Sequence, residues 1–437
     1  MSLNRLLDLA GLPRDELPAA ARTRARFSLC DWIACGRAAV DEPLAIALRG
    51  FVAAEGGNPV ASVFGDGAAP ARAAALVNGA TSHALDYDDT HFGHVGHPSV
   101  GIYPAALAAA EETGATASDV VDAFLVGAEA SIRVGLVLGR GHYNRGFHQT
   151  ATAGAFGATV AAGRIYGLDR DRLRAAIGLC ATRASGLKSQ FGTMGKPYNA
   201  GISASNGVEC AALARAGFSS ADDGLMGPQG FVATHSDDPD EAGAWGDPPP
   251  ATFLFEDIKY KLHACCHGTH AMIEGLAAAG RERNLTPERV GEIRLRTNPR
   301  WLSVCDIKTP RTGLEVKFSY LWLAGMVLSG IPTASEAAYT DALAGDPSLA
   351  RLAQRISVEG DAQLSDMQAA GDIALDDGSV VPFAHDLAAP LPDAELEQRL
   401  RAKGAGLIGS AADRIWAATE DLDRLGARDL GQMLRNS

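Results

Sequence analysis

The densest group of chemically active side chains lies between His83 and Ser99, in the segment HALDYDDTHFGHVGHPS. It brings three aspartates and four histidines into 15 residues. Carboxylates and imidazoles are costly to bury unpaired, so such a group beside apolar helices is either a solvated loop or a functional site. The apolar Leu85, Tyr87 and Val95 alternate with the polar residues and would anchor them, which favours a site in a cleft. Imidazole changes charge near neutral pH and suits acid–base catalysis.

The same residue types are ligands for zinc, manganese or iron, so a metal-dependent hydrolase is an alternative interpretation. However, the spacing in this segment fits neither H-E-x-x-H, H-x-H nor a clear two-histidine, one-carboxylate pattern. We therefore expect no metal at this site.

A second segment, 139–150, combines cations and imidazoles with glycine ahead of an apolar helix. It contributes Arg140, Tyr143, Arg145 and His148. Free backbone N–H groups at a helix start, together with two arginines, suit an anion. The alternative is an ordinary glycine-rich connection between helices. Neither a G-x-G-x-x-G motif after a strand nor a P-loop is present, which argues against a nucleotide-binding fold.

Three lysines occupy segments that glycine or proline would hold in place. Lys196 stands between Gly195 and Pro197, Lys261 precedes a Cys-Cys pair, and Lys317 follows PRTGLEV. A lysine in a partly buried pocket can act as a general base or clamp a carboxylate, although a surface loop is the commoner setting for one.

The overall charge makes these cations informative. The chain has 437 residues, a net charge of −13 and a pI near 5.3. Such an acidic surface repels nucleic acid and anionic membranes, and it would also repel an anionic substrate. A carboxylate-binding site therefore needs its own cations, and the segments above supply them.

Cysteine usage and hydropathy favour a soluble cytoplasmic protein. The seven cysteines are odd in number and form no C-x-x-C pair, as expected of buried thiols in a reducing compartment. The N-terminal segment resembles no signal peptide, and no apolar stretch approaches the roughly 20 residues of a membrane span.

The elements that must hold these residues are mostly helices, whose small alanine and glycine side chains favour close packing in a large bundle. Periodic apolar residues predict helices near 20–37, 70–85, 100–113, 116–139, 150–166, 170–185 and 203–217, and a Thr116/Asp119 capping box begins the fourth. After a Pro- and Asp-rich break at 236–250, strands are predicted near 293–297 and 356–359, with a hairpin around Asp377-Gly378. Further helices are predicted at 267–280, 318–329, 393–402 and 406–435. We expect a mostly α, two-domain protein: a helical domain at 1–255, rejoined by 396–437, and a smaller α+β domain at 256–395.

Five segments, taken in order, resemble the MmgE/PrpD family, which includes 2-methylcitrate dehydratase, cis-aconitate decarboxylase and iminodisuccinate epimerase. They are HALDYDDTH with HPS, GFHQTATAGAFGA, FGTMGKPYNAG with NGVECAALARAGF, KLHACCHGTH and PRTGLEVKFS. The resemblance implies a homodimer without metal or organic cofactor and a site between the domains. Matched motif by motif, it implies site roles for a set of six residues: Asp86, Thr90, His97, His148, Lys196 and Lys261. Tyr143 lies where epimerase-like members offer a phenol.

Two departures from the family pattern bear on the reaction. Val100 follows Ser99 where dehydratases show aspartate, and Trp322 stands where decarboxylase-like members show tyrosine, with Tyr320 as the neighbouring phenol. We expect a cofactor-independent lyase acting on a small di- or tricarboxylate, with an iminodisuccinate-type epimerase as the alternative. Two further hypotheses are a metal-dependent hydrolase and a non-catalytic carboxylate binder.

We expect two groups of side chains to share the work of this site. The catalytic residues are Asp86, His97, His148, Lys196 and Tyr143. The substrate-binding residues are Thr90, Arg140, Arg145, Lys261 and Lys317.

Overall fold

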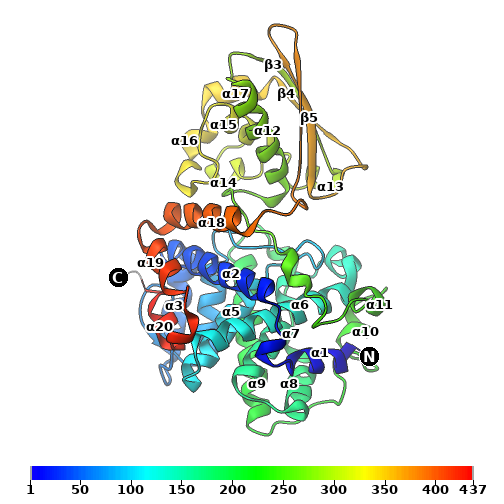
Figure 1. The fold of residues 1–437 in the computed structure, drawn as a ribbon, viewed down its shortest axis with the longest axis vertical. Coiled ribbons are helices and arrows are strands. Elements are labelled where there is room, and N and C mark those ends of the chain that lie inside the picture. Colours follow the sequence, from blue (N-terminus) through cyan, green and yellow to red (C-terminus); the bar gives the residue numbers. More distant parts are fainter. Residues whose placement is uncertain (1, 436–437) are drawn as a thin grey trace. The chain divides into compact units, whose positions relative to one another are not determined.

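The computed structural model describes residues 2–435, which form two compact units. Described residues up to Tyr260 and from Ile408 onward make up the first unit, and Lys261–Leu407 make up the second. The first unit is almost wholly helical, and the second combines helices with a four-stranded sheet (Figure 1). The predicted fold class, a large helical domain with a smaller α+β domain, is therefore confirmed.

The first unit contains the helices that carry most of the predicted site. Its α-helices are α1 (Ser2–Ala10), α2 (Ala19–Ala38), α3 (Pro43–Glu55), α4 (Ala71–Ser82), α5 (Pro98–Thr113), α6 (Ala117–Arg145), α7 (Gln149–Ile165), α8 (Arg170–Arg183), α9 (Gly195–Arg215), α10 (Phe231–His235), α11 (Glu241–Ala244), α19 (Ala411–Ala418) and α20 (Ala427–Gln432). Short 3₁₀ turns and a two-stranded ladder complete it: η1 (Arg14–Glu16), η2 (Lys188–Gln190), η3 (Leu254–Asp257), η6 (Leu422–Arg424), β1 (Ala61–Ser62) and β2 (Ala68–Ala69).

Small residues let the central helices α4, α5, α6, α7 and α9 pack in close contact. A Cβ added at Gly79 of α4 would lie 2.9 Å from the Cα of Gly201 on α9. A Cβ added at Gly157 of α7 would lie 2.4 Å from the carbonyl oxygen of Gly127 on α6. Backbones this close leave no room for larger side chains, so the expectation that alanine and glycine would favour close helix packing is confirmed.

Two features of α6 fix where it begins and where it bends. The Thr116 hydroxyl accepts from the Asp119 N–H, and the Asp119 carboxylate accepts from the Thr116 N–H, so the predicted capping box is present. At Gly139 the backbone has φ 72°, which bends the helix, and a further helical stretch runs to Arg145. Most of the segment 139–150 is therefore helix rather than a loop.

Helix α9 begins earlier than the sequence pattern predicts. The apolar periodicity points to a start near residue 203, whereas the helix begins at Gly195 and includes Lys196 and Pro197 in its first turn. Proline is tolerated there because the first N–H groups of a helix have no intrahelical partner. Lys196 is consequently held by a helix end and not by a loop.

The second unit is an α+β domain. Its helical elements are η4 (His267–Thr269), α12 (His270–Arg283), α13 (Pro299–Leu302), α14 (Gly313–Val316), α15 (Tyr320–Leu328), η5 (Glu336–Ala338), α16 (Asp341–Ala344), α17 (Pro347–Ala353) and α18 (Asp393–Ile408). Its strands are β3 (Val290–Thr297), β4 (Ile356–Gly360), β5 (Gln368–Leu375) and β6 (Val380–Asp386).

The sheet has the strand order β4-β3-β5-β6, with β3 parallel to β4 and the other two pairs antiparallel. Ile293 pairs with Ile356 on one side and Ile373 on the other, so the apolar alternation predicted for these strands lies in register. Helices α12 and α15 cover one face of the sheet (Figure 1). The predicted β5–β6 hairpin around Asp377-Gly378 is confirmed.

The structure also bears on the predicted state of the cysteines and on the prediction that the chain has no membrane span. All seven cysteines are free thiols; six are buried and Cys266 is half-buried. Within residues 2–435, none of the helices combines the length and the apolar character needed to cross a membrane.

Candidate active site

Three of the five predicted catalytic side chains lie at the N-terminal ends of three neighbouring helices of the first unit. His97 is the N-cap residue of α5, His148 is the N-cap residue of α7, and Lys196 lies in the first turn of α9. These three helices pack against one another. The backbone N–H of His97 donates to Thr150 Oγ1 over 3.1 Å, which ties the ends of α5 and α7 together. Converging N-terminal helix ends create a positive field that suits a carboxylate.

In the loop after α4, a buried tyrosine stands between two aspartates of the site. Asp86 adopts a left-handed backbone conformation with φ 51°, a conformation that non-glycine residues rarely adopt. The next residue, Tyr87, is fully buried and anchors the loop, so the carboxylates on either side are held beside the imidazoles. Thr90 then forms a two-hydrogen-bond bridge with Lys259, which fixes the end of the loop. The Thr90 hydroxyl has no hydrogen-bond partner among the described residues.

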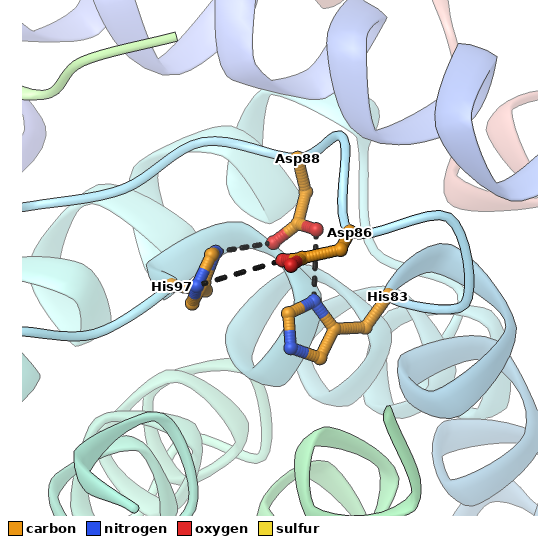
Figure 2. A group of neighbouring side chains, drawn as sticks. All are labelled: His83, Asp86, Asp88 and His97. Atoms are coloured by element: carbon orange, nitrogen blue, oxygen red, sulfur yellow. Dashed lines mark hydrogen bonds and ion pairs between the residues drawn. The ribbon is translucent and has the colours of Figure 1, made fainter. Parts of the chain in front are cut away.

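Asp88 lies between two imidazoles, as Figure 2 shows. His83 Nδ1 lies 2.8 Å from Asp88 Oδ1, and His97 Nδ1 lies 2.9 Å from Asp88 Oδ2. The same His97 nitrogen lies 2.8 Å from the backbone carbonyl of Asp89. The angles favour the carbonyl as acceptor of the His97 hydrogen bond, while the Asp88 oxygen makes an ion-pair contact beside it. The Asp88 carboxylate thus orients the His83 ring by a hydrogen bond and lies in ion-pair contact with the His97 ring, which the Asp89 carbonyl orients.

The charge of Asp88 is set by two opposing effects. Burial would raise the pKa of this carboxyl, but the facing imidazoles of His83 and His97 outweigh burial and hold the pKa well below its ordinary value. Asp88 is therefore a carboxylate at neutral pH.

The pKa of the neighbouring Asp89 is shifted in the opposite direction to that of Asp88, upward. Asp89 is buried and accepts hydrogen bonds from the Ser99 N–H and hydroxyl and from the Ser28 hydroxyl. Burial raises its pKa to about 7 against the lowering effect of the Ser99 hydrogen bond, and the negative charges of Asp88 and Asp31 add to the rise. The carboxyl fixes the loop to α2 and α5 from the protein side.

Lys196, Asp86 and His97 form the more accessible side of the site. Lys196 Nζ lies 2.7 Å from Asp86 Oδ1, and His97 Nε2 lies 4.0 Å from the same oxygen. The three side chains remain 18%, 33% and 13% exposed, respectively. A lysine ammonium has three protons, so Lys196 can bind Asp86 and still donate to a substrate carboxylate.

His148 stands beside this group but is buried. Its ring centroid lies 6.2 Å from that of His83 and 4.9 Å from that of Phe191. Burial lowers the pKa of His148 well below its ordinary value, and the positive charges of His83 and Lys196 act in the same direction. The imidazole is therefore neutral at pH 7. Asn199 Nδ2, on α9, lies 3.3 Å from His148 Nδ1.

Four side chains could offer ligands to a metal ion. One donor atom from each of His83, Asp86, Asp88 and His97 lies within 4.8 Å of the others. In the structure these donors already have partners: both oxygens of Asp88 face imidazole nitrogens, and Asp86 faces the Lys196 ammonium. A bound cation would have to displace that ammonium and the imidazole protons, so the donor set is poorly arranged for a metal.

The other residues predicted in segment 139–150 have different surroundings in the first unit. The Tyr143 ring contacts Lys188, whose Nζ lies 3.6 Å from the ring centroid. Arg140 is exposed, and Arg145 is exposed and paired with Asp237. The contacts of Tyr143 with Lys188 and of Arg145 with Asp237 do not involve the group around Asp88, which consists of Asp88 with His83, Asp86 and His97.

The remaining predicted lysines belong to the second unit. Lys261 is buried at 3% exposure, and Lys317 pairs with Glu336. The Tyr320 hydroxyl donates to the Gly268 carbonyl oxygen over 2.8 Å, so this buried phenol forms a hydrogen bond within the core of the second unit. Trp322 is also buried there.

Sequence reasoning did not single out His83, Asp88, Thr150 or Asn199 as site residues. His83 and Asp88 lie inside the conspicuous HALDYDDTH segment, but their five-residue spacing gives no sign that the two side chains meet. Thr150 and Asn199 are ordinary helix residues by composition. Their roles depend on contacts between α5, α7 and α9, which only the folded chain defines.

The fold and this site define a two-domain protein with acid–base side chains gathered at helix N-termini. The sequence matches the MmgE/PrpD N-terminal domain over residues 9–242 and the MmgE/PrpD C-terminal domain over residues 263–424. This chain belongs to the MmgE/PrpD family.

Curated relatives cover part of the chain. A cis-aconitate decarboxylase of Aspergillus terreus is 31% identical over 287 residues, which are 61% of this chain and 57% of that protein. The cis-aconitate decarboxylase of Homo sapiens is 28% identical over 229 residues, covering 50% of this chain and 46% of that protein. The chain thus matches about half the length of these relatives.

Proposed function

We propose that this protein is a lyase that acts on a small di- or tricarboxylic acid by proton transfer at a carbon next to a carboxylate. The observation that carries the proposal is the group formed by Lys196, Asp86 and His97, with neutral His148 beside it. It combines a cation that can bind a carboxylate with imidazoles that can move a proton. The names of the curated relatives make decarboxylation of a cis-aconitate-type acid the first candidate reaction.

Each side chain has a role in this proposal. Lys196 binds a substrate carboxylate and stabilises the negative charge that develops on the adjoining carbon. Asp86 holds the lysine in place, and Asp88 holds His97. Lys261 and Lys317 of the second unit, with Thr90, Arg140 and Arg145, stay predictions as substrate-binding residues. The homodimer and the cytoplasmic location also stay predictions.

The epimerase alternative requires two bases on opposite faces of one carbon. The candidate pair for it is Tyr143 and Lys196, but Tyr143 contacts Lys188 and Lys196 contacts Asp86. These two contacts do not bring Tyr143 and Lys196 to one another, so the lyase remains the proposal and the epimerase an alternative that activity measurements decide.

The test is a substrate panel in deuterated water, comprising cis- and trans-aconitate, methylcitrate, citrate and iminodisuccinate. We expect carbon dioxide, with solvent deuterium on the product carbon, or alkene formation from one of these acids. Deuterium uptake with inverted configuration and neither carbon dioxide nor alkene would contradict the lyase and support the epimerase. Tight binding of an acid without turnover would support the non-catalytic binder.

We further expect turnover to be independent of a transition metal. Lys196 and the imidazole protons already neutralise the carboxylates that would be ligands. Dialysis against a chelator should leave the rate unchanged, and elemental analysis should find far less than one ion per chain. Loss of activity on chelation, restored by zinc, manganese or iron, would instead favour the hydrolase alternative.

A further inference from the structure

The two imidazoles of the site face different kinds of hydrogen-bond partner through their Nδ1 atoms. His97 Nδ1 faces two oxygens, the carbonyl of Asp89 at 2.8 Å and Oδ2 of Asp88 at 2.9 Å. Both oxygens can only accept a hydrogen bond, because one belongs to a backbone carbonyl and the other to the ionised carboxylate of Asp88. When the His97 ring is neutral, its one proton therefore stays on Nδ1, which leaves Nε2 with a lone pair.

His148 Nδ1 faces a donor instead. Asn199 Nδ2 lies 3.3 Å from His148 Nδ1 and 3.2 Å from the carbonyl oxygen of Leu187. The carbonyl can only accept, so the Asn199 atom in contact with both must be the NH₂ group, whose two hydrogens serve the two acceptors. His148 Nδ1 consequently accepts a hydrogen bond, and the single proton of this neutral ring resides on Nε2.

We propose that Asn199 is a positioning residue that holds His148 as the acid of the site, in the tautomer opposite to that of His97, which acts as the base. Both Asn199 and His148 are buried, at 4% and 2% exposure, so water does not compete for this contact. The assignment rests on the proposed lyase function for its chemical meaning, but the tautomers themselves are properties of the free protein.

The pairing supports either lyase reaction. In a dehydration, His97 Nε2 takes the proton from carbon and the electron pair of that C–H bond forms the alkene. The C–O bond breaks with its pair on oxygen, which takes the Nε2 proton of His148 and leaves as water; the imidazolate left at His148 then regains a proton through water as His97 releases the one that it took from carbon. In a decarboxylation, the C–C bond leaves its electron pair on carbon as carbon dioxide departs, the Nε2 proton of His148 is added to that carbon, and the imidazolate left at His148 takes a proton from water.

The test is ¹⁵N nuclear magnetic resonance of the histidine rings in the full-length free protein. Single His97→Gln and His148→Gln variants assign the two rings among the 11 histidines. We expect the proton of His97 on Nδ1 and the proton of His148 on Nε2. The same tautomer in both rings, or a proton on His148 Nδ1, would overturn the proposal.

The Asn199→Asp variant tests the positioning role directly. A carboxylate there is an acceptor, so we expect a proton to move onto His148 Nδ1 while the tautomer of His97 is unchanged. Turnover should fall about 10-fold or more, in kcat rather than KM. Asn206→Asp is the matched control, because Asn206 is equally buried two turns along α9 and donates to the Arg183 carbonyl instead of a histidine. An unchanged His148 tautomer in a folded Asn199→Asp protein would overturn the proposal.

The two proposals can fail separately. If none of the acids is converted but the opposite tautomers are observed, the lyase is wrong and the positioning role of Asn199 stands. If turnover is found but the tautomers agree with each other, the lyase stands and the assignment of acid and base is wrong.

Discussion

Replacement of Lys196 by alanine is expected to lower turnover by about 100-fold or more while the protein remains folded. The ammonium lies 2.7 Å from Asp86 and is the cation of the group around His97. Without it, the charge that develops on carbon loses a fixed stabilising partner, and removal of one such partner typically costs about 10²–10³-fold in kcat. Alanine removes both the ammonium and the apolar stem of the lysine. The Lys196→Met variant keeps an apolar stem and removes only the charge, so it checks that the loss of turnover comes from the charge.

Lys188→Met is the matched control. Lys188 lies in η2, eight residues before Lys196 in the sequence, and its ammonium packs on the Tyr143 ring and donates to the Tyr143 carbonyl oxygen. We expect this variant to retain turnover within about threefold. Steady-state kinetics with the active acid, together with circular dichroism of each variant, make the comparison. Near-normal turnover in folded Lys196→Met would discard the assignment of this lysine to the site.

Replacement of His97 by glutamine is expected to produce a loss of similar size. His97 Nε2 is the ring nitrogen that points toward Asp86 Oδ1, at 4.0 Å, and the side chain is 13% exposed, so a substrate can reach it. Loss of a positioned acid or base typically costs about 10²–10⁴-fold. Glutamine keeps a polar group near the Asp89 carbonyl and can preserve the loop while it removes the titratable ring.

His235→Gln provides the corresponding control in the same unit. The ring of His235 contacts Phe231 and Thr234 at the end of α10 and packs near the rings of Phe147 and His142, and none of these residues belongs to the group around Asp88. This variant should keep turnover within about twofold and resemble the native protein in thermal denaturation. Full activity of folded His97→Gln would show that proton transfer occurs elsewhere.

The features of the fold that can be predicted from the sequence are those that depend on residues close together in the chain. The helical periodicity, the Thr116 capping box and the hairpin at Asp377-Gly378 are local features, and the structure contains each of them. The start of α9 is not visible in the sequence because Lys196 and Pro197 interrupt the apolar pattern without interrupting the backbone geometry of a first helical turn. Apolar periodicity reports which face is buried and says little about where a helix begins.

The site shows the same division. Residue types in HALDYDDTH and around Lys196 predict acid–base chemistry, because carboxylates, imidazoles and a lysine are costly to bury unless they are paired or belong to a functional site. The partner of each group is not readable from the sequence, since Asp88 meets His97 across a turn and Asn199 meets His148 across two helices.

The sequence by itself determined the family resemblance and the fold class, and it predicted an anion-binding, acid–base site in the first half of the chain. The tertiary structure alone decided that Tyr143 contacts Lys188 while Lys196 contacts Asp86, and that His97 and His148 face opposite kinds of hydrogen-bond partner. The physical reason is that composition and periodicity are properties of neighbouring residues. Ion pairs and tautomers depend on distances of a few ångströms between residues that are far apart in the chain, and only the packing of α5, α7 and α9 sets those distances.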